Sequence, residues 1–139
     1  METLEIQNLI QHAETAREHS YSPYSGYMVG AALLTDTGQI VTGCNIENAA
    51  YGPSNCAERT AFFKAVSDGV LHFRAIAIVG GKRNGKRDYA HPCGVCRQVM
   101  AEFCNPETFW IIVAKNQEEY KVYTLKELLP ESFGSDNLS

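Results

Sequence analysis

Apolar positions along the chain switch repeatedly between the helical and the extended period. Over residues 3–19 they recur every three to four positions, which predicts an amphipathic helix. Short apolar runs bounded by turn residues predict strands over residues 28–35, 40–46, 73–79, 109–114 and 120–123. The helical period returns over residues 56–67, 95–103 and 125–129. The predicted order is therefore α-β-β-α-β-α-β-β-α.

This alternation of strands and helices favours an α/β fold in which helices cover a single sheet. Asp36-Thr37-Gly38 predicts a hairpin turn, so the first two strands should be antiparallel. Later strands that are joined through helices should be parallel. We therefore predict a three-layer α/β/α sandwich around a mixed five-stranded sheet. No repeat or linker interrupts residues 1–139, which predicts a single domain.

The composition is that of an ordinary globular protein, with 45% hydrophobic and 20% charged residues. A net charge of -4 argues against a nucleic acid polymer as partner, because such partners require a basic face. Basic residues cluster only around Asn84-Gly85, which is a turn signal. We interpret this cluster as a solvated hairpin tip, the alternative being a rim that attracts phosphate. The basic cluster consists of Lys82, Arg83, Lys86 and Arg87.

Neither a membrane span nor a secretory signal is expected. No apolar run approaches the roughly 18 residues that a membrane helix needs. Glu2 and Glu5 precede any apolar stretch, which is unlike a signal peptide. These features predict a cytoplasmic protein that does not bind a membrane.

The five cysteines are more consistent with metal binding than with disulfides. Their number is odd, and a reducing compartment is expected. Cys56 and the pair Cys93 and Cys96 lie at the predicted starts of two helices, with Ser54 or Asn55 expected as N-cap of the first. Helix N-termini favour thiolates, and Cys-x-x-Cys is a common zinc-ligand spacing. We predict one Zn²⁺ per chain on these three thiolates, with the fourth position open.

The position of Glu58 predicts that the metal site is catalytic and not purely structural. It lies two residues after Cys56, close to the metal but on another side of the helix. A carboxylate there can move protons between an activated water and a substrate, which is the arrangement of the zinc deaminases. A Cys-x-x-Cys alone would also fit a redox pair. A structural zinc site would need a fourth ligand, and none is obvious.

Several segments besides the zinc motif resemble the small, single-domain cytidine deaminase family. The similarity spans about residues 20–133, and Asn45-Ile46-Glu47-Asn48-Ala49-Ala50-Tyr51 narrows it to nucleosides. The resemblance implies hydrolytic deamination of cytidine and 2′-deoxycytidine to uridine or deoxyuridine and ammonia, in pyrimidine salvage. The similar segments are Ser22-Pro23-Tyr24-Ser25, residues 29–33, 43–52 and 56–59, Pro92-Cys93-Gly94-Val95-Cys96-Arg97, and Glu127-Leu128-Leu129-Pro130.

The resemblance also implies a set of substrate-binding residues. Asn45 and Glu47 would hold the ribose hydroxyls, which suits an amide and a carboxylate. Tyr27 stands where the family commonly has Phe packed against the base. The backbone of Ala57 would contact the base, and Tyr51 would lie near the pocket.

Two further features concern a neighbouring subunit and the charge of the metal. Phe133 resembles a C-terminal aromatic that this family inserts into the neighbour's site, which implies a homotetramer. Zinc with three thiolates is formally -1, so a guanidinium bonded to a thiolate would restore some electrophilicity. The resemblance supports Arg59 in that role, and Arg97 is a second candidate because it follows Cys96.

Other residues near these motifs are expected to be structural. Cys44, Cys104 and Trp110 are predicted to be buried, and His91 to have a structural or solvent role, with the pocket wall as alternative.

Three rival functions stay open at this point. The nearest is deamination of another aminopyrimidine nucleoside, such as an antibiotic of the blasticidin type. The second is editing of a polynucleotide, which the acidic charge opposes. The third is a non-catalytic zinc or nucleoside-binding module, which would leave Glu58 without a role.

Overall fold

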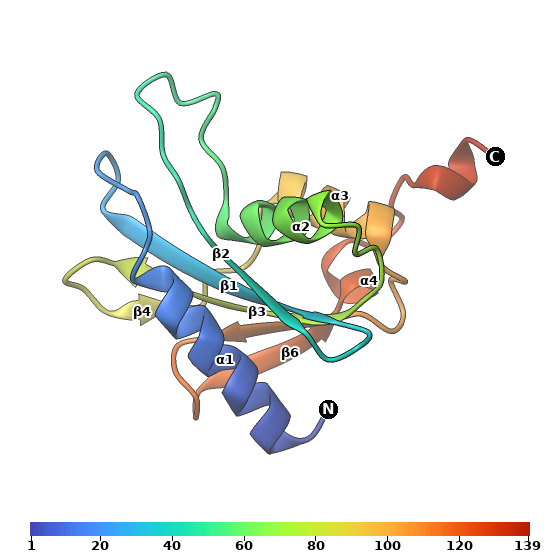
Figure 1. Ribbon diagram of the computed structural model, residues 1–139, viewed down its shortest axis with the longest axis horizontal. Helices are drawn as coiled ribbons and strands as arrows, with labels where there is room; N and C mark the ends of the chain where they lie inside the picture. The colour runs from blue at the N-terminus through green and yellow to red at the C-terminus, as the bar shows by residue number, and fades with distance from the viewer.

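One mixed sheet organises the computed structural model, which describes residues 1–139 (Figure 1). Its strand order is β2-β1-β3-β5-β6, and a short strand, β4, pairs with the end of β3. The strands are β1 (Tyr27–Thr35), β2 (Ile40–Cys44), β3 (Phe73–Lys82), β4 (Arg87–Asp88), β5 (Trp110–Ala114) and β6 (Tyr120–Thr124). The helices are α1 (Thr3–Arg17), α2 (Ala57–Ser67), α3 (Gly94–Phe103), α4 (Leu125–Leu128) and a 3₁₀ turn, Ser135–Asn137.

The predicted three-layer α/β/α arrangement is confirmed. Side chains of successive strand residues point to opposite faces of a sheet, so each strand supplies two cores. In β1, Ala32 and Leu34 pack with α1 on one face. Ala31 and Leu33 pack with α2 and α3 on the other face. Figure 1 shows α1 on one side of the sheet and α2 and α3 on the opposite side.

The strand directions agree with the prediction, and one strand is added to it. The β1–β2 hairpin is antiparallel and the β3–β5 pair is parallel, as expected. β2 and β3, which α2 connects, are also parallel to each other, because each pairs antiparallel with β1, which lies between them. A sixth strand, β4, was not predicted. It exists because β3 continues to Lys82 before the basic turn folds the chain back on Gly80 and Gly81.

Trp110 corrects another expectation, since 37% of its surface is exposed. It is the first residue of β5 and lies near Met1, beyond the start of α1 at Thr3. The helix layer therefore does not cover it fully. Cys104 is buried as predicted, whereas Cys44 is only half-buried.

Two glycines let helices lie directly on the first hairpin. A Cβ atom on Gly30 would lie 2.1 Å from the carbonyl oxygen of Ala13 in α1. On Gly43 it would lie 2.6 Å from backbone atoms of Ala57 and Ala61 in α2. Only glycine permits such approaches. The contact at Gly43 places the first turn of α2 against the sheet.

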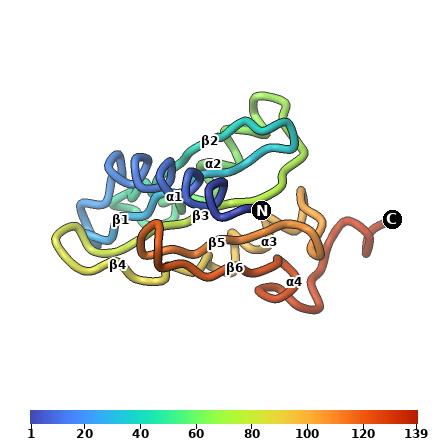
Figure 2. Tube along the Cα trace, turned by 90° about the horizontal axis from the view of Figure 1, so that it is seen from below, coloured from blue at the N-terminus to red at the C-terminus, as the bar shows by residue number.

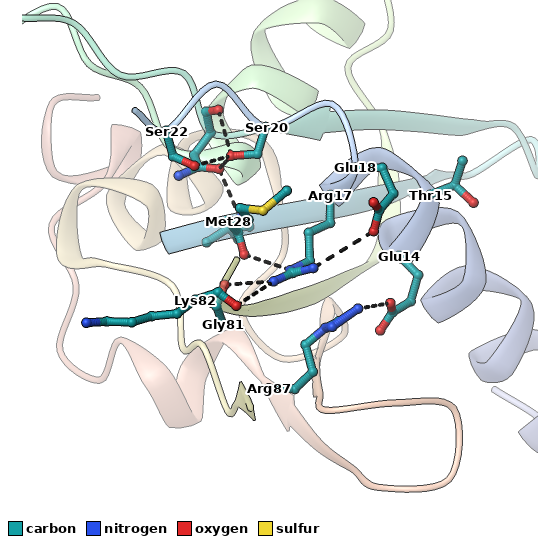
Figure 3. A network of polar contacts seen from close by, with 12 residues as sticks. Glu14, Thr15, Arg17, Glu18, Ser20, Ser22, Met28, Gly81, Lys82 and Arg87 are labelled. Atoms are coloured by element: carbon teal, nitrogen blue, oxygen red, sulfur yellow. Dashed lines mark hydrogen bonds and ion pairs between the residues drawn. The ribbon is translucent and has the colours of Figure 1, made fainter. Parts of the chain in front are cut away.

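A buried arginine joins the end of α1 to the ends of two strands (Figure 3). Arg17 is 4% exposed, and its Nε donates to the carbonyl oxygen of Met28 at 3.0 Å. Its Nη2 donates to the carbonyl oxygens of Gly81 at 2.8 Å and Lys82 at 3.2 Å. A buried guanidinium needs such acceptors to offset its lost hydration. The start of β1 is thereby held beside the end of β3.

None of the helices is long and apolar enough to cross a membrane.

Candidate active site

The starts of α2 and α3 bring three cysteine side chains together. Cys56 is the N-cap of α2 and Cys93 the N-cap of α3, where its sulfur accepts from the backbone N–H of Cys96 at 3.5 Å. Neither Ser54 nor Asn55 caps α2, because the helix begins one residue later than that prediction requires. The three sulfur atoms all lie within 4.8 Å of one another.

The geometry of this cluster fits a zinc ion. Tetrahedral zinc with Zn–S bonds of about 2.3 Å requires sulfur atoms roughly 3.8 Å apart. The sulfur atoms of Cys56 and Cys93 are 3.7 Å apart. Thiolate donors favour zinc over hard cations such as magnesium. The cluster contains no fourth side-chain ligand, which leaves one coordination position for a water or substrate atom.

Arg59 supplies positive charge to the thiol cluster. Its Nη2 donates to the sulfur of Cys56 at 3.3 Å. Hydrogen bonds from Cys96, Arg59 and Cys93 lower the pKa of the Cys56 thiol to about 5, against the opposing effect of burial. A thiol with such a pKa is ionised at neutral pH, which is the form that binds metal.

Arg97 does not contact a thiol, contrary to the sequence-based expectation. Its Nε donates to the carbonyl oxygen of Pro92 at 2.7 Å, and its Nη1 to that of Leu128 at 2.7 Å. Adjacency to Cys96 was misleading, because successive residues of a helix point in different directions. Arg97 ties the loop before α3 to the end of α4.

Glu58 lies in the first turn of α2 and is 4% exposed. Burial raises the pKa of its carboxyl to about 7, and the negative charge of Cys56 acts in the same direction. Both the protonated and the ionised form are therefore accessible near neutral pH. A group of this kind can accept a proton and return it.

A cavity of about 540 Å³ opens over this group. It brings together Tyr27, Asn45, Glu47, Ala57 and Glu58 with Arg59 and two of the thiols. The remaining wall residues were not predicted as site residues: Val29, Ser54, Asn55, Tyr89, Ala90 and His91. A larger cleft of about 630 Å³ among α1, β4 and the β5–β6 turn contains no apolar residue and none of the three thiols. The chemistry therefore points to the smaller cavity.

His91 lies in the cavity wall, which was the alternative to the structural or solvent role predicted for it. It directly precedes Pro92, so its position in the sequence already placed it near Cys93. Its ring nitrogens form hydrogen bonds with the carbonyl oxygen of Tyr89 and the hydroxyl of Tyr123, both at 3.1 Å. Tyr89 and Ala90 lie in irregular chain and carry no such signal.

Asn45 and Glu47 line the same cavity, and each is bonded to nearby backbone. The Asn45 side chain accepts from the N–H of Val29 at 2.9 Å and donates to the carbonyl oxygen of Tyr27 at 2.8 Å. Glu47 Oε1 accepts from the N–H groups of Tyr24 at 3.0 Å and Ser25 at 3.1 Å. Both side chains are thus oriented before any ligand binds.

Tyr51 and Phe133 do not line this cavity. Tyr51 is 73% exposed and packs edge-on against Tyr24, with ring centroids 6.4 Å apart. Phe133 is 58% exposed, and its carbonyl oxygen accepts from Gln98 at 2.9 Å. Figure 1 shows that the β2–α2 loop and the segment after α4 project from the body, and Figure 2 shows the same of the latter. Neither aromatic contributes to the cavity of its own chain.

Comparison with known proteins assigns the family. Residues 4–112 match the family model of the cytidine and deoxycytidylate deaminase zinc-binding region. A cytidine deaminase from Sporosarcina psychrophila is 47% identical over 136 residues, 98% of this chain and 96% of that protein. One from Halalkalibacterium halodurans is 45% identical, covering 98% and 99%. The crystal structure of cytidine deaminase from Burkholderia pseudomallei superposes with a TM-score of 0.80 at 46% identity, covering 91% and 97%. The chain therefore belongs to the cytidine and deoxycytidylate deaminase family.

Proposed function

We propose that this protein is a zinc-dependent cytidine deaminase that hydrolyses cytidine and 2′-deoxycytidine to uridine or 2′-deoxyuridine and ammonia. The observation that carries the proposal is the buried carboxyl of Glu58 beside three thiols whose spacing fits zinc. The same cavity is also lined by the polar pair Asn45 and Glu47, which suits a sugar.

Cys56, Cys93 and Cys96 would hold the metal ion. When bound, zinc makes a water molecule more acidic and polarises the reacting centre. Arg59 offsets part of the negative charge of three thiolates through its hydrogen bond to Cys56. The arginine thus keeps the metal electrophilic without being a ligand.

Glu58 moves the protons of the reaction. Its ionised carboxylate accepts a proton from the attacking water and delivers it to N3 of the cytosine ring. The water oxygen bonds to C4, and Glu58 carries a second proton from the resulting C4 hydroxyl to the exocyclic amine, so that the C4–N bond breaks and ammonia leaves. A pKa of about 7 for this carboxyl makes both directions of transfer feasible at neutral pH.

The remaining wall residues would orient the nucleoside. The ring of Tyr27 packs against the base, and the backbone of Ala57 lies in the wall beside Glu58. The Asn45 amide keeps one N–H free to donate to a sugar hydroxyl, and the Glu47 carboxylate accepts a hydrogen bond from a sugar hydroxyl.

The proposal extends to assembly and location. The exposed rings of Tyr51 and Phe133 lie on projecting segments, which suits a homotetramer in which neighbouring subunits complete one another's sites. All five cysteines are free thiols, as is typical of the reducing cytoplasm. Pyrimidine salvage would be the corresponding role.

The direct test is incubation of the zinc-loaded protein with cytidine while absorbance and released ammonia are followed. Loss of the cytosine band with one ammonia per nucleoside supports the proposal. 2′-Deoxycytidine, blasticidin S and single-stranded RNA are tested as substrates in parallel reactions. If the folded, zinc-loaded protein deaminates only blasticidin S or only the RNA, the proposal is overturned.

A further inference from the structure

The carboxylate of Glu47 takes every one of its hydrogen bonds from one short segment, the loop of residues 20–26. Two of the donors are backbone N–H groups, and the third is the hydroxyl of Ser25, which donates to Oε2. The Ser25 oxygen in turn accepts from the backbone N–H of Tyr27, the first residue of β1, at 3.0 Å. The serine therefore links the carboxylate to the start of the strand.

This link matters because Glu47 has little else to hold it. The residue is only half-buried, so packing alone does not fix its rotamer, and a free glutamate side chain loses considerable entropy when it is ordered. The Ser25 hydroxyl is also the main reason that the pKa of Glu47 is lowered, which keeps the carboxylate ionised. A carboxylate offers about four acceptor positions. Three are occupied, so one remains for a ligand hydroxyl.

The neighbouring Asn45 is oriented by Ser20 of the same loop and by two residues of β1. Its Oδ1 accepts from the hydroxyl of Ser20 and from the N–H of Val29, which assigns Nδ2 to the side of Tyr27. The Ser20 oxygen in turn lies 3.1 Å from the hydroxyl of Ser22, from which it can accept, as Figure 3 shows. One donor on Asn45 and one acceptor position on Glu47 are then left side by side in the cavity wall.

We propose that Ser25 is a positioning residue for sugar recognition: its hydroxyl holds the Glu47 carboxylate in place to accept a hydrogen bond from a hydroxyl of the nucleoside sugar. This inference rests on the proposed function. Ser25 lies outside the cavity lining, so it acts through Glu47 and does not touch the reacting atoms.

The expected signature is a change in KM that depends on the sugar. Ser25→Ala should raise KM for 2′-deoxycytidine about tenfold with kcat nearly unchanged, because a charge-assisted hydrogen bond is lost far from the base. The same comparison is made with 2′,3′-dideoxycytidine and 2′,5′-dideoxycytidine. The analogue that lacks the hydroxyl bound by Glu47 should have the same KM with both proteins.

Two variants separate positioning from loss of a hydroxyl in general. Ser25→Thr keeps the Oγ donor and should restore KM to within about twofold of the original protein. Ser67→Ala removes an exposed serine hydroxyl at the end of α2, outside the cavity, and should change nothing. Thermal melting of all variants checks that the fold is intact, which the exposure of Ser25 favours.

An unchanged KM for 2′-deoxycytidine in Ser25→Ala would overturn the inference. An equal rise for all three nucleosides would also overturn it, since the serine would then support the loop and not the sugar contact. If the original protein turns over none of them while folded and zinc-loaded, the proposed function itself fails.

Discussion

Two groups of cavity residues are held in place by different kinds of interaction: the thiol end, formed by Cys56, Cys93 and Glu58, and the proposed sugar end, formed by Asn45 and Glu47. At the thiol end, Cys56 and Cys93 are helix N-caps and Glu58 lies in a first turn, so secondary structure itself positions them. At the sugar end, Asn45 and Glu47 follow the last residue of β2 and lie outside the helices and strands. Hydrogen bonds to distant loop and strand residues orient them instead.

This difference separates catalysis from recognition. A helix terminus pressed onto a sheet is rigid and supplies the free N–H groups and dipole that thiolates favour. Side chains bonded across loops can be altered one at a time without disturbing the metal. Changes at the thiol end should therefore alter metal content and kcat, whereas changes at the sugar end should alter KM.

The largest effect is expected from removing one thiol. Cys93→Ala leaves two sulfur ligands and should bring bound zinc well below one ion per chain, with turnover below detection. Metal analysis of the purified protein measures this directly. Cys44→Ala removes a thiol outside the cluster and should retain both zinc and activity. Full zinc occupancy in Cys93→Ala would mean that the thiol end is assembled differently.

Glu58→Gln should separate proton transfer from metal binding. The amide fits the same buried space but cannot accept the proton, so kcat should fall by about 10² to 10⁴ while zinc stays at one per chain. Steady-state kinetics and metal analysis on the same sample provide the two readouts. Appreciable turnover would show that another group carries the protons.

The raised pKa of Glu58 predicts a pH effect on the metal-free protein. In the unfolded chain this carboxyl titrates near the ordinary glutamate pKa of 4.5, and in the folded protein its pKa is about 7. The folded state therefore binds the extra proton between these values, and its free energy of unfolding falls as pH rises through them, by about 3 kcal/mol. Below pH 4.5 the carboxyl is protonated in both states, so its burial no longer lowers the free energy of unfolding.

Denaturant unfolding of metal-free protein at pH 4.5 and pH 8 measures this effect. Glu58→Gln lacks the titrating group. The free energy of unfolding of this variant, minus that of the original protein, should therefore rise by about 3 kcal/mol from pH 4.5 to pH 8. An equal pH dependence in both proteins would contradict the burial of an ionisable Glu58.

The smallest effect is expected at the sugar end. Asn45→Ala removes the bonds to Tyr27 and Val29 as well as the free donor, so KM should rise about tenfold and stability should fall by about 1–3 kcal/mol. Zinc content and kcat should stay close to those of the original protein. Loss of zinc in this variant would break the separation between the two ends, and parallel metal analysis tests it.

The thiol end was predictable because its determinants are local in the sequence. The spacing within Cys56-Ala57-Glu58 and between Cys93 and Cys96 needs only a helix start to place the members of each group together, and the apolar period indicated both starts. That the two groups meet depends on the tertiary structure, because Cys56 and Cys93 are 37 positions apart. The N-cap was predicted one or two residues too early, because Ser54 and Asn55 are common N-cap residue types, whereas Cys56 holds that position without a capping side-chain hydrogen bond. The three layers of the fold were predicted from the alternation between the helical and the extended period of apolar positions.

The tertiary structure alone decided the rest, since those contacts join residues far apart in the chain. Asn45 and Glu47 bond to residues that precede them by 16 to 25 positions, and Arg97 bonds to Leu128 instead of to a thiol. Insertion of β1 between β2 and β3 likewise depends on how the sheet closes over its two cores. Local spacing specifies helices, strands and their caps, whereas partners in a folded chain depend on packing that no short segment encodes.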